Sequence, residues 1–217
     1  MKFSIIVPHY DGSISDATFE RGIKCLLNQT LQDFEVLIYH DGPISRPIPK
    51  IWESFGDRAK LIITDKRKND WGHSNRDLGI KIASGEYILH FNPDNILYED
   101  AIESLSKEIK FNKVRKLDGA VIPNDIIVFP VIMRGMQSNG KMLWRDKNFV
   151  NSDYMVFTGY PPVKNNIDCM QVVIKTSIWR LHGGWFDKRE DGDGNMYPLF
   201  IHTYQARYCS KILGEHW

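Results

Sequence analysis

The sequence has few cysteines and no long apolar run, and each of these absences excludes a class of protein. Cys25, Cys169 and Cys209 are far apart and show no Cys-x-x-Cys spacing. This usage argues against a disulfide framework or a zinc knuckle and is typical of reduced thiols in a cytosolic protein. The longest strongly apolar stretch, residues 126–133, is too short to cross a bilayer and contains a proline. We therefore expect a soluble, cytoplasmic protein with no transmembrane segment.

The chain also lacks a charge excess and the common catalytic signatures. It carries 28 basic and 27 acidic residues, so no net field attracts nucleic acid or an anionic membrane surface, and we expect no nucleic-acid partner. There is no P-loop, no Gly-x-Gly-x-x-Gly after the first apolar run and no Gly-x-Ser-x-Gly motif. Its 217 residues are enough for one α/β domain and rather few for two.

Short β-branched runs alternate with amphipathic segments over the first half of the chain. This alternation predicts a mostly parallel sheet covered by helices on both faces. Strands are expected at residues 3–7, 34–39, 58–65 and 86–91, and helices at residues 11–30, 75–83 (capped by Ser74) and 99–111. Further along, we expect a hairpin or loop at residues 138–150, a strand running into a short helix at residues 170–185, and a last helix at residues 197–213.

Each of the four predicted strands is followed by polar residues. In open parallel sheets, ligands bind at the carboxyl ends of the strands, because loops and helix N-termini meet there. The sequence therefore predicts a ligand site at this edge. The residues concerned are Pro8-His9-Tyr10-Asp11, His40-Asp41-Gly42, Asp65 with the basic loop after it, and Asn92-Pro93-Asp94-Asn95.

Four blocks of the sequence resemble those of the family 2 glycosyltransferases of the GT-A fold. They are residues 3–12, 34–43, 72–95 and 178–194, in the order and at the approximate spacing of that family. The resemblance is good over residues 3–100 and moderate over residues 167–205. It implies a single GT-A catalytic domain over residues 1–217. Residues 1–100 would form the nucleotide-sugar-binding half and residues 101–217 the acceptor-binding half, and the domain could belong to a longer multi-domain protein.

The resemblance also implies which residues bind the donor. A carboxylate held on a turn provides the fixed acceptor that recognition of a nucleobase needs, and a guanidinium can fork onto phosphate oxygens. His40 stands where the family commonly has a second acid, and a solvated helix arginine remains an alternative for Arg76. The implied donor-binding residues are Pro8, His9 and Asp11 beside the nucleotide, Asp41 at the base, Asn75 and Arg76 near the diphosphate, and Asn92 at the ribose.

The block after the fourth strand implies a metal site with one carboxylate. Asp94 matches the second acid of the family's Asp-x-Asp pattern, and Asn92 replaces the first. One protein carboxylate suffices for Mn²⁺ or Mg²⁺, since phosphate oxygens and waters fill most of the coordination shell, and the ion would neutralise the departing diphosphate. His202 or His216 could supply a late ligand, with a solvated or core histidine as the alternative. A helix cap is the alternative role for Asp94.

Catalysis by this family needs a general base, which the resemblance places at Asp191 or Glu190, with Asp191 favoured. Neighbouring carboxylates can raise each other's pKa toward a useful value. A solvated acidic turn is the alternative. A calcium loop is excluded, because Arg189 and Pro198 occupy ligand positions.

A further set of residues is expected to line the sugar or acceptor pocket, with a core tryptophan as the alternative for the last of them. They are Asp168, Gln171 and Trp185.

The resemblance as a whole implies an inverting transferase that moves one sugar from a UDP-, GDP- or dTDP-linked donor to a glycan, a glycoprotein or another hydroxyl acceptor. The lack of a transmembrane segment and of a Gln-x-x-Arg-Trp motif argues against a processive synthase. Two alternatives stay open: a nucleotidyltransferase that makes sugar nucleotides, and a non-catalytic module that binds a nucleotide sugar or a glycan.

Overall fold

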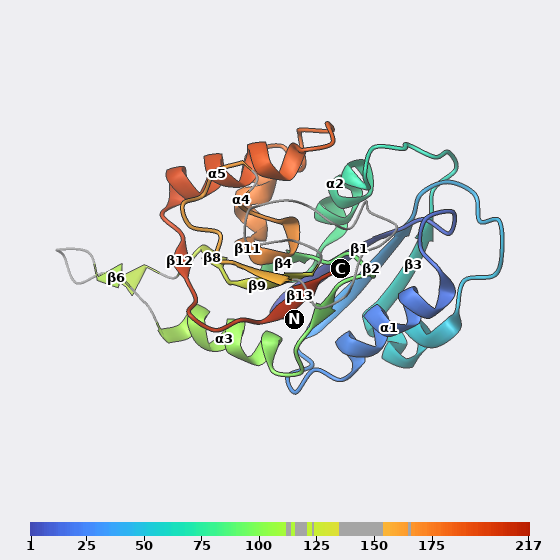
Figure 1. Cartoon of the computed structure of the whole chain (residues 1–217), viewed down its shortest axis with the longest axis horizontal. Helices are drawn as coiled ribbons and strands as arrows, with labels where there is room; N and C mark the ends of the chain where they lie inside the picture. The colour runs from blue at the N-terminus through green and yellow to red at the C-terminus, as the bar shows by residue number, and fades with distance from the viewer. Residues whose placement is uncertain (112–113, 116–120, 123, 135–153, 165) are drawn as a thin grey trace.

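The computed structural model of the chain has a central seven-stranded sheet with helices on both faces (Figure 1). A smaller four-stranded sheet packs beside it. The structure describes residues 1–111, 114–115, 121–122, 124–134, 154–164 and 166–217.

The large sheet has the order β12-β8-β11-β4-β1-β2-β3. Strands β4, β1, β2 and β3 are parallel, whereas β11 runs antiparallel to both of its neighbours and β12 is parallel to β8. The predicted α/β fold with a mostly parallel central sheet is therefore confirmed. The strands are β1 (Phe3–His9), β2 (Phe34–His40), β3 (Ala59–Ile63), β4 (Tyr87–His90), β8 (Ile126–Val128), β11 (Val172–Lys175) and β12 (Arg207–Tyr208).

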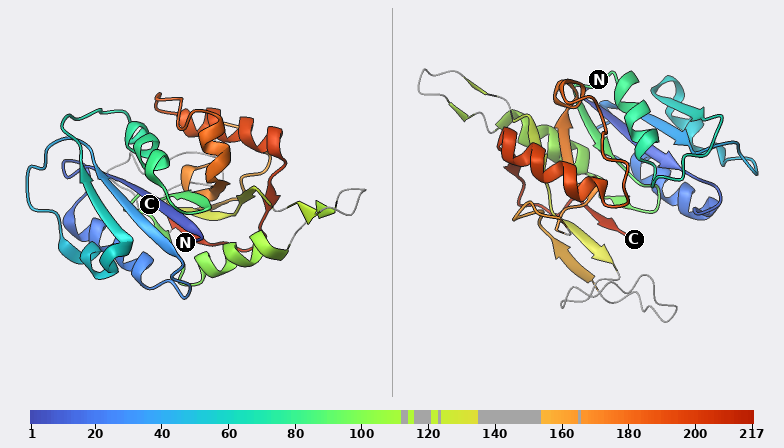
Figure 2. Two further views of the ribbon diagram at one scale, coloured as in Figure 1. Left: turned by 180° about the vertical axis from the view of Figure 1, so that it is seen from behind. Right: turned by 90° about the horizontal axis from the view of Figure 1, so that it is seen from above.

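Helices cover the two faces in separate groups, as Figures 1 and 2 show. Because side chains alternate along a strand, Ile5 and Val7 pack into the core under the first group, and Ile6 packs into the core under the second. One face carries α1 (Asp16–Leu27), the 3-10 helix η1 (Lys50–Arg58) and α3 (Ala101–Phe111); the other carries α2 (His73–Ile82), α4 (Thr176–Leu181) and α5 (Gly192–Tyr204).

The smaller sheet brings the C-terminal strand next to the loop that follows β4. Its order is β10-β9-β13-β5, with β13 antiparallel to β5. Its strands are β5 (Ile96–Leu97), β9 (Val131–Arg134), β10 (Tyr154–Phe157) and β13 (Gly214–His216). The remaining elements are the strand pair β6 (Val114–Arg115) and β7 (Val121–Ile122), and the 3-10 helix η2 (Cys169–Gln171).

Two predictions about helix ends are wrong. Helix α2 begins at His73, and the Asp70 carboxylate rather than Ser74 caps it, accepting a hydrogen bond from the Ser74 backbone N–H at 3.0 Å. The last helix was expected at residues 197–213, but α5 ends at Tyr204. The rest of that segment forms β12, which pairs with β8. The chain then enters β13, which pairs with β9 and β5.

Two other predictions concern segments rather than helix ends. The hairpin expected at residues 138–150 lies outside the described residues. Among the described residues, no helix is both long enough and apolar enough to cross a membrane.

Candidate functional site

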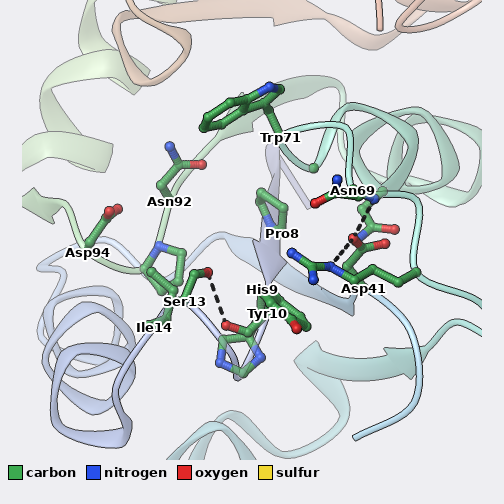
Figure 3. Close-up of a pocket in the computed structure, with 14 residues that line it drawn as sticks. Pro8, His9, Tyr10, Ser13, Ile14, Asp41, Asn69, Trp71, Asn92 and Asp94 are labelled. Atoms are coloured by element: carbon green, nitrogen blue, oxygen red, sulfur yellow. Dashed lines mark hydrogen bonds and ion pairs between the residues drawn. The ribbon is translucent and has the colours of Figure 1, made fainter. Parts of the chain in front are cut away.

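A cavity of about 530 Å³ opens at the carboxyl ends of β1, β2 and β4 (Figure 3). All of its lining residues come from residues 8–94, and all but Asn75, which lies in α2, belong to the strand ends and the loops that follow them. The site therefore forms at the sheet edge where the sequence predicts it. Of the predicted donor-binding residues, Pro8, His9, Asp41, Asn75 and Asn92 line the cavity, as does Asp94.

Asp41 lies directly after β2 and holds the loop at one end of the cavity. Its two carboxylate oxygens accept hydrogen bonds from the backbone N–H groups of Lys68 (2.9 Å) and Asn69 (3.1 Å). A carboxylate oxygen has two lone pairs, so each oxygen can still accept one further hydrogen bond. Asp41 thus shapes the cavity and keeps the capacity to accept from a ligand.

His40 has a structural role behind this end of the cavity. The side chain is fully buried; its Nδ1 lies 2.7 Å from the Gly42 carbonyl oxygen, and its Nε2 accepts the Asp11 backbone N–H at 3.3 Å. The same Nε2 atom lies 3.4 Å from the Asp11 Oδ1 atom, so the His40 ring connects the turn after β2 with Asp11. Burial lowers the pKa of the neighbouring His9 to about 4, so the His9 ring is neutral near pH 7.

The Asp11 carboxylate points to a neighbouring loop. Its Oδ2 atom accepts hydrogen bonds from the backbone N–H (2.7 Å) and the hydroxyl (2.8 Å) of Ser45. These bonds outweigh the effect of burial and lower the pKa of Asp11 to about 2. Asp11 therefore stays ionised and fastens the loop after β2.

Aromatic and cationic side chains form the rim of the cavity. The Arg67 guanidinium lies over the Tyr10 ring at 3.7 Å, a cation–π arrangement. Trp71 is 63% exposed although it lines the cavity, and its φ of 59° lies in the left-handed region. A bulky residue seldom adopts this conformation, and such strain gathers at functional sites. The rim thus offers a flat aromatic surface to a ligand.

Arg76 is buried behind the cavity wall, so the alternative of a solvated helix arginine is wrong. Its NH2 nitrogen donates to the Asn92 Oδ1 atom at 2.6 Å, and its NH1 nitrogen donates to the Trp71 carbonyl oxygen at 2.7 Å. The guanidinium also lies over the Trp185 ring at 5.1 Å. Arg76 thereby ties the rim to the loop after β4.

Helix α1 positions the loop that carries Asp94. At Gly22 an added Cβ atom would lie only 2.1 Å from the Pro93 carbonyl oxygen, so the close packing of helix and loop requires glycine. The same helix carries Arg21, whose guanidinium donates to the Asp94 carbonyl oxygen at 2.6 Å. Both contacts fix the backbone and leave the Asp94 carboxylate free to face the cavity (Figure 3).

The Asp94 carboxylate has the properties of a metal ligand. Its Oδ1 atom is buried and has no hydrogen-bond partner among the residues that the structure describes. Burial raises the pKa of this carboxyl, and the nearby His216 opposes part of the shift. The Nε2 atom of His216 lies 3.5 Å from the Asp168 Oδ2 atom, whereas His202 is exposed on α5. Strand β13 therefore places His216 on the Asp94 side of the site.

A second group of ligand-type side chains lies beside Arg76. The ligand atoms of Asp168, Cys169 and Asp193 lie within 4.8 Å of one another. Burial raises the pKa of the Cys169 thiol well above its usual range, and the Arg76 guanidinium donates to its sulfur at 3.6 Å. The Cys169 thiol is held in its protonated form, and the Arg76 cation already contacts its sulfur. This group therefore suits a metal ion less well than Asp94 does.

The predicted catalytic pair lies at the surface, just before α5. Asp191 forms an ion pair with Lys164, which lowers the pKa of its carboxyl, and it accepts from the Asn195 side-chain amide at 3.3 Å. Glu190 is exposed. Lys164 and Asp193 were not singled out from the sequence. The local signal for Asp193 in the sequence is its position two residues after Asp191.

Two of the predicted pocket residues are part of the core. Gln171 is fully buried, and its side-chain amide donates to the carbonyl oxygens of Phe129 (3.1 Å) and Phe157 (2.9 Å). Trp185 is 1% exposed and stacks between His73 and Trp179. The expectation that these two side chains line a pocket is therefore wrong, because other side chains and backbone cover them.

Solved structures of similar fold include two that contain a nucleotide or nucleotide sugar. S. aureus TarS 1–349 in complex with UDP has a TM-score of 0.68 at 15% identity, covering 100% of this chain and 60% of that one. The mannosyltransferase PcManGT from Pyrobaculum calidifontis, in complex with GDP-Man and Mn²⁺, has a TM-score of 0.61 at 12% identity, covering 99% and 56%. Both likenesses show the GT-A fold.

Relatives in sequence match part of the chain. It is 26% identical over 128 residues to a cholesterol galactosyltransferase of Borreliella burgdorferi, covering 59% of this chain and 33% of the relative. It is 35% identical over 111 residues to an uncharacterized glycosyltransferase of Rickettsia felis, covering 51% and 18%. The chain spans a third or less of the length of these relatives. The family model described as glycosyl transferase family 2 matches residues 4–181, which is most of the chain, and the chain therefore belongs to that family.

Proposed function

We propose that the chain is the catalytic domain of a glycosyltransferase that moves one sugar from a nucleotide-diphosphate sugar to a hydroxyl group of a glycan or glycoprotein acceptor. The observation that carries this proposal is the cavity of about 530 Å³ at the strand ends, with Asp41 at one end and Asp94 at the other. Its position in a member of family 2, and the UDP and GDP-Man in the two structural relatives, support a nucleotide donor.

Within this proposal each end of the cavity has a separate task. The Asp41 carboxylate accepts a hydrogen bond from the base, and the exposed ring of Trp71 covers the nucleoside. The Asn92 amide nitrogen, directed away from Arg76, donates toward the ribose or the diphosphate. These contacts bind and orient the donor, which lowers the entropy cost of the transfer step.

A divalent metal ion fits the other end of the cavity. The buried, unpartnered Asp94 Oδ1 atom is the hard oxygen donor that Mg²⁺ and Mn²⁺ prefer, and His216 from β13 lies on the same side of the site. When bound, the ion would neutralise negative charge on the diphosphate. Because Asn92 contributes no charge, we propose that the protein binds the ion mainly together with the nucleotide.

We infer that the transfer proceeds with inversion. The acceptor hydroxyl oxygen attacks the anomeric carbon from the side opposite the diphosphate, and the bond from that carbon to the diphosphate oxygen breaks as the new bond forms. A carboxylate from the segment that begins α5 takes the hydroxyl proton. Asp191 is the residue that the family resemblance implies for this step.

Thermal-shift and calorimetric titrations with UDP, GDP and dTDP, each with and without Mn²⁺, test the proposal. We expect one nucleotide to raise the melting temperature, and Mn²⁺ to increase the shift. Incubation with the matching nucleotide sugars should then release the nucleotide. Binding without release, even with a panel of glycan acceptors, would indicate the non-catalytic module, and the absence of any binding would contradict the proposal.

A further inference from the structure

The segment that begins α5 presents two aspartates in different directions. Asp191 immediately precedes the first residue of the helix, and Asp193 lies two residues further on, within its first turn. Asp191 is the N-cap residue and has non-helical backbone angles, whereas Asp193 is helical, and the two side chains contact different groups.

Asp191 is already engaged by two neighbouring side chains. Its carboxylate forms an ion pair with Lys164 and accepts from the Asn195 side chain. The Asp191 side chain is 37% exposed, and the ion pair lowers the pKa of its carboxyl. A carboxylate held in its ionised form by a lysine is a weak proton acceptor, because protonation would break the pair.

Asp193 faces the interior of the site. Its carboxylate accepts from the Gly194 backbone N–H at 2.8 Å and lies with the Asp168 carboxylate and the Cys169 thiol, all within 4.8 Å. Burial, with Asp168 as the next cause, raises the pKa of Asp193 to about 6. It keeps some exposure, as a group that meets a substrate needs.

Arg76 connects this carboxylate with the donor cavity. Its side chain is 3% exposed, its Nε atom has no partner among the described residues, and its NH2 nitrogen reaches both the Asn92 Oδ1 atom and the Cys169 sulfur. One guanidinium thus lies between the cavity wall and the group that contains Asp193. A buried cation with an unused N–H beside a carboxylate marks a place where an anionic or polar ligand atom would be stabilised.

We propose that Asp193, and not Asp191, is the catalytic base, with Asp191 acting as a surface anchor that ties the start of α5 to Lys164. This inference rests on the proposed glycosyltransferase function. In the transfer step, the proton of the acceptor hydroxyl moves to the Asp193 carboxylate while the hydroxyl oxygen bonds to the anomeric carbon. The bonding electrons of the carbon–diphosphate bond leave with the nucleotide diphosphate.

Release of UDP or GDP from a nucleotide sugar tests the assignment. The donor is whichever of UDP-glucose, UDP-N-acetylglucosamine and GDP-mannose gives the largest thermal shift with Mn²⁺, and water serves as the acceptor. Asp193→Asn should lower the release rate by roughly 100-fold or more, the usual share of a general base. Asp191→Asn should lower it by less than about tenfold, and Asp57→Asn, at an exposed position of η1, is the neutral control.

Folding and donor binding are checked in the same proteins. Each variant should melt cooperatively and bind UDP or GDP with a dissociation constant within about threefold of the wild type. The inference is overturned if Asp191→Asn loses as much activity as Asp193→Asn, or if Asp193→Asn stays active. A wild type that binds the donor and leaves it intact also overturns it, because a well-placed base activates water. If the wild type binds no donor at all, the proposed function itself fails.

Discussion

The Arg76 guanidinium donates to the Asn92 Oδ1 atom at 2.6 Å, and this contact fixes the direction of the amide. A guanidinium has no acceptor, so the amide oxygen must face Arg76 and the amide nitrogen must point elsewhere. Asn92 lines the cavity, and Figure 3 shows its side chain on the same wall as Asp94. The position to which the family resemblance assigns the first acid of the Asp-x-Asp pattern is thus occupied by a hydrogen-bond donor that is oriented by a buried cation.

This contact predicts that Asn92→Asp does not create a strong metal site. The new carboxylate would pair with Arg76, and this ion pair would raise the free energy of unfolding by about 1 kcal/mol over the present bond to a neutral amide. We expect the affinity of the nucleotide-free protein for Mn²⁺ to change less than about threefold, measured by calorimetry. A gain of tenfold or more would mean that residue 92 can reach the ion despite Arg76.

Asp41→Asn should weaken nucleotide binding without unfolding the protein. The amide has one acceptor oxygen, so either the Lys68 or the Asn69 backbone N–H would face an N–H₂ donor, and the loop at that end of the cavity would shift. We expect the dissociation constant for the preferred nucleotide diphosphate to rise at least about tenfold, since a lost charge-assisted hydrogen bond costs about 1.5–3 kcal/mol. Asp57→Asn, at an exposed position of η1, should leave the constant unchanged.

The first half of the fold could be predicted from the sequence because its signals are local. Apolar runs such as Phe3–His9 and Phe34–His40 end in turn residues, and the helices between them carry regular apolar positions. The carboxyl ends of parallel strands share one edge, so the site residues after each strand could be grouped without a structure. Asp41 and Asn92, with Asp94, do line one cavity.

The second half depends on long-range contacts that leave little local trace. Strands β12 and β13 have two and three residues, and their pairing partners lie far away in the sequence. Helix α5 begins at Gly192 and contains Pro198, residues that oppose helix formation, so tertiary packing rather than propensity stabilises it. The burial of Asp193 beside Asp168 is likewise a tertiary effect, which is why the sequence favoured Asp191.

Asp94→Asn should remove the effect of metal on nucleotide binding. In the wild type, Mn²⁺ should raise the affinity for the nucleotide diphosphate, because Asp94 and the diphosphate would share the ion. In the variant, Mn²⁺ should change that affinity less than about twofold, while binding in EDTA should equal that of the wild type. The two affinities are measured by calorimetry with and without the ion.

The pH dependence of this effect follows from the burial of Asp94. Burial raises the pKa of its carboxyl, and the ion binds only the ionised form, so the benefit of Mn²⁺ should fade as pH falls toward that raised pKa. Asp57→Asn, at an exposed position of η1, serves as the matched control. A full metal effect in Asp94→Asn would assign the ion to other residues.

The raised pKa of Asp193 predicts that Asp193→Asn stabilises the protein at neutral pH. The carboxyl titrates near pH 6 in the folded state and near its ordinary value of 3.8 in the unfolded state. Between these values the folded protein holds a proton that the unfolded chain has lost, so the free energy of unfolding falls as pH rises from about 4 to about 6. Asparagine has no such cost. The variant should match the wild type below pH 4 and exceed it by on the order of 2 kcal/mol at pH 7.5.

Urea denaturation at pH 4.0 and pH 7.5 measures this difference, and all other titrating groups cancel in the comparison. Asp191→Asn is the contrasting variant. Its carboxyl has a lowered pKa because of Lys164, so the native ion pair is lost in the variant and its stability at pH 7.5 should not rise. If Asp193→Asn gains nothing between the two pH values, or if Asp191→Asn gains as much, the carboxylate of Asp193 is not held in the buried setting beside Asp168 and Arg76 that its role as a base requires.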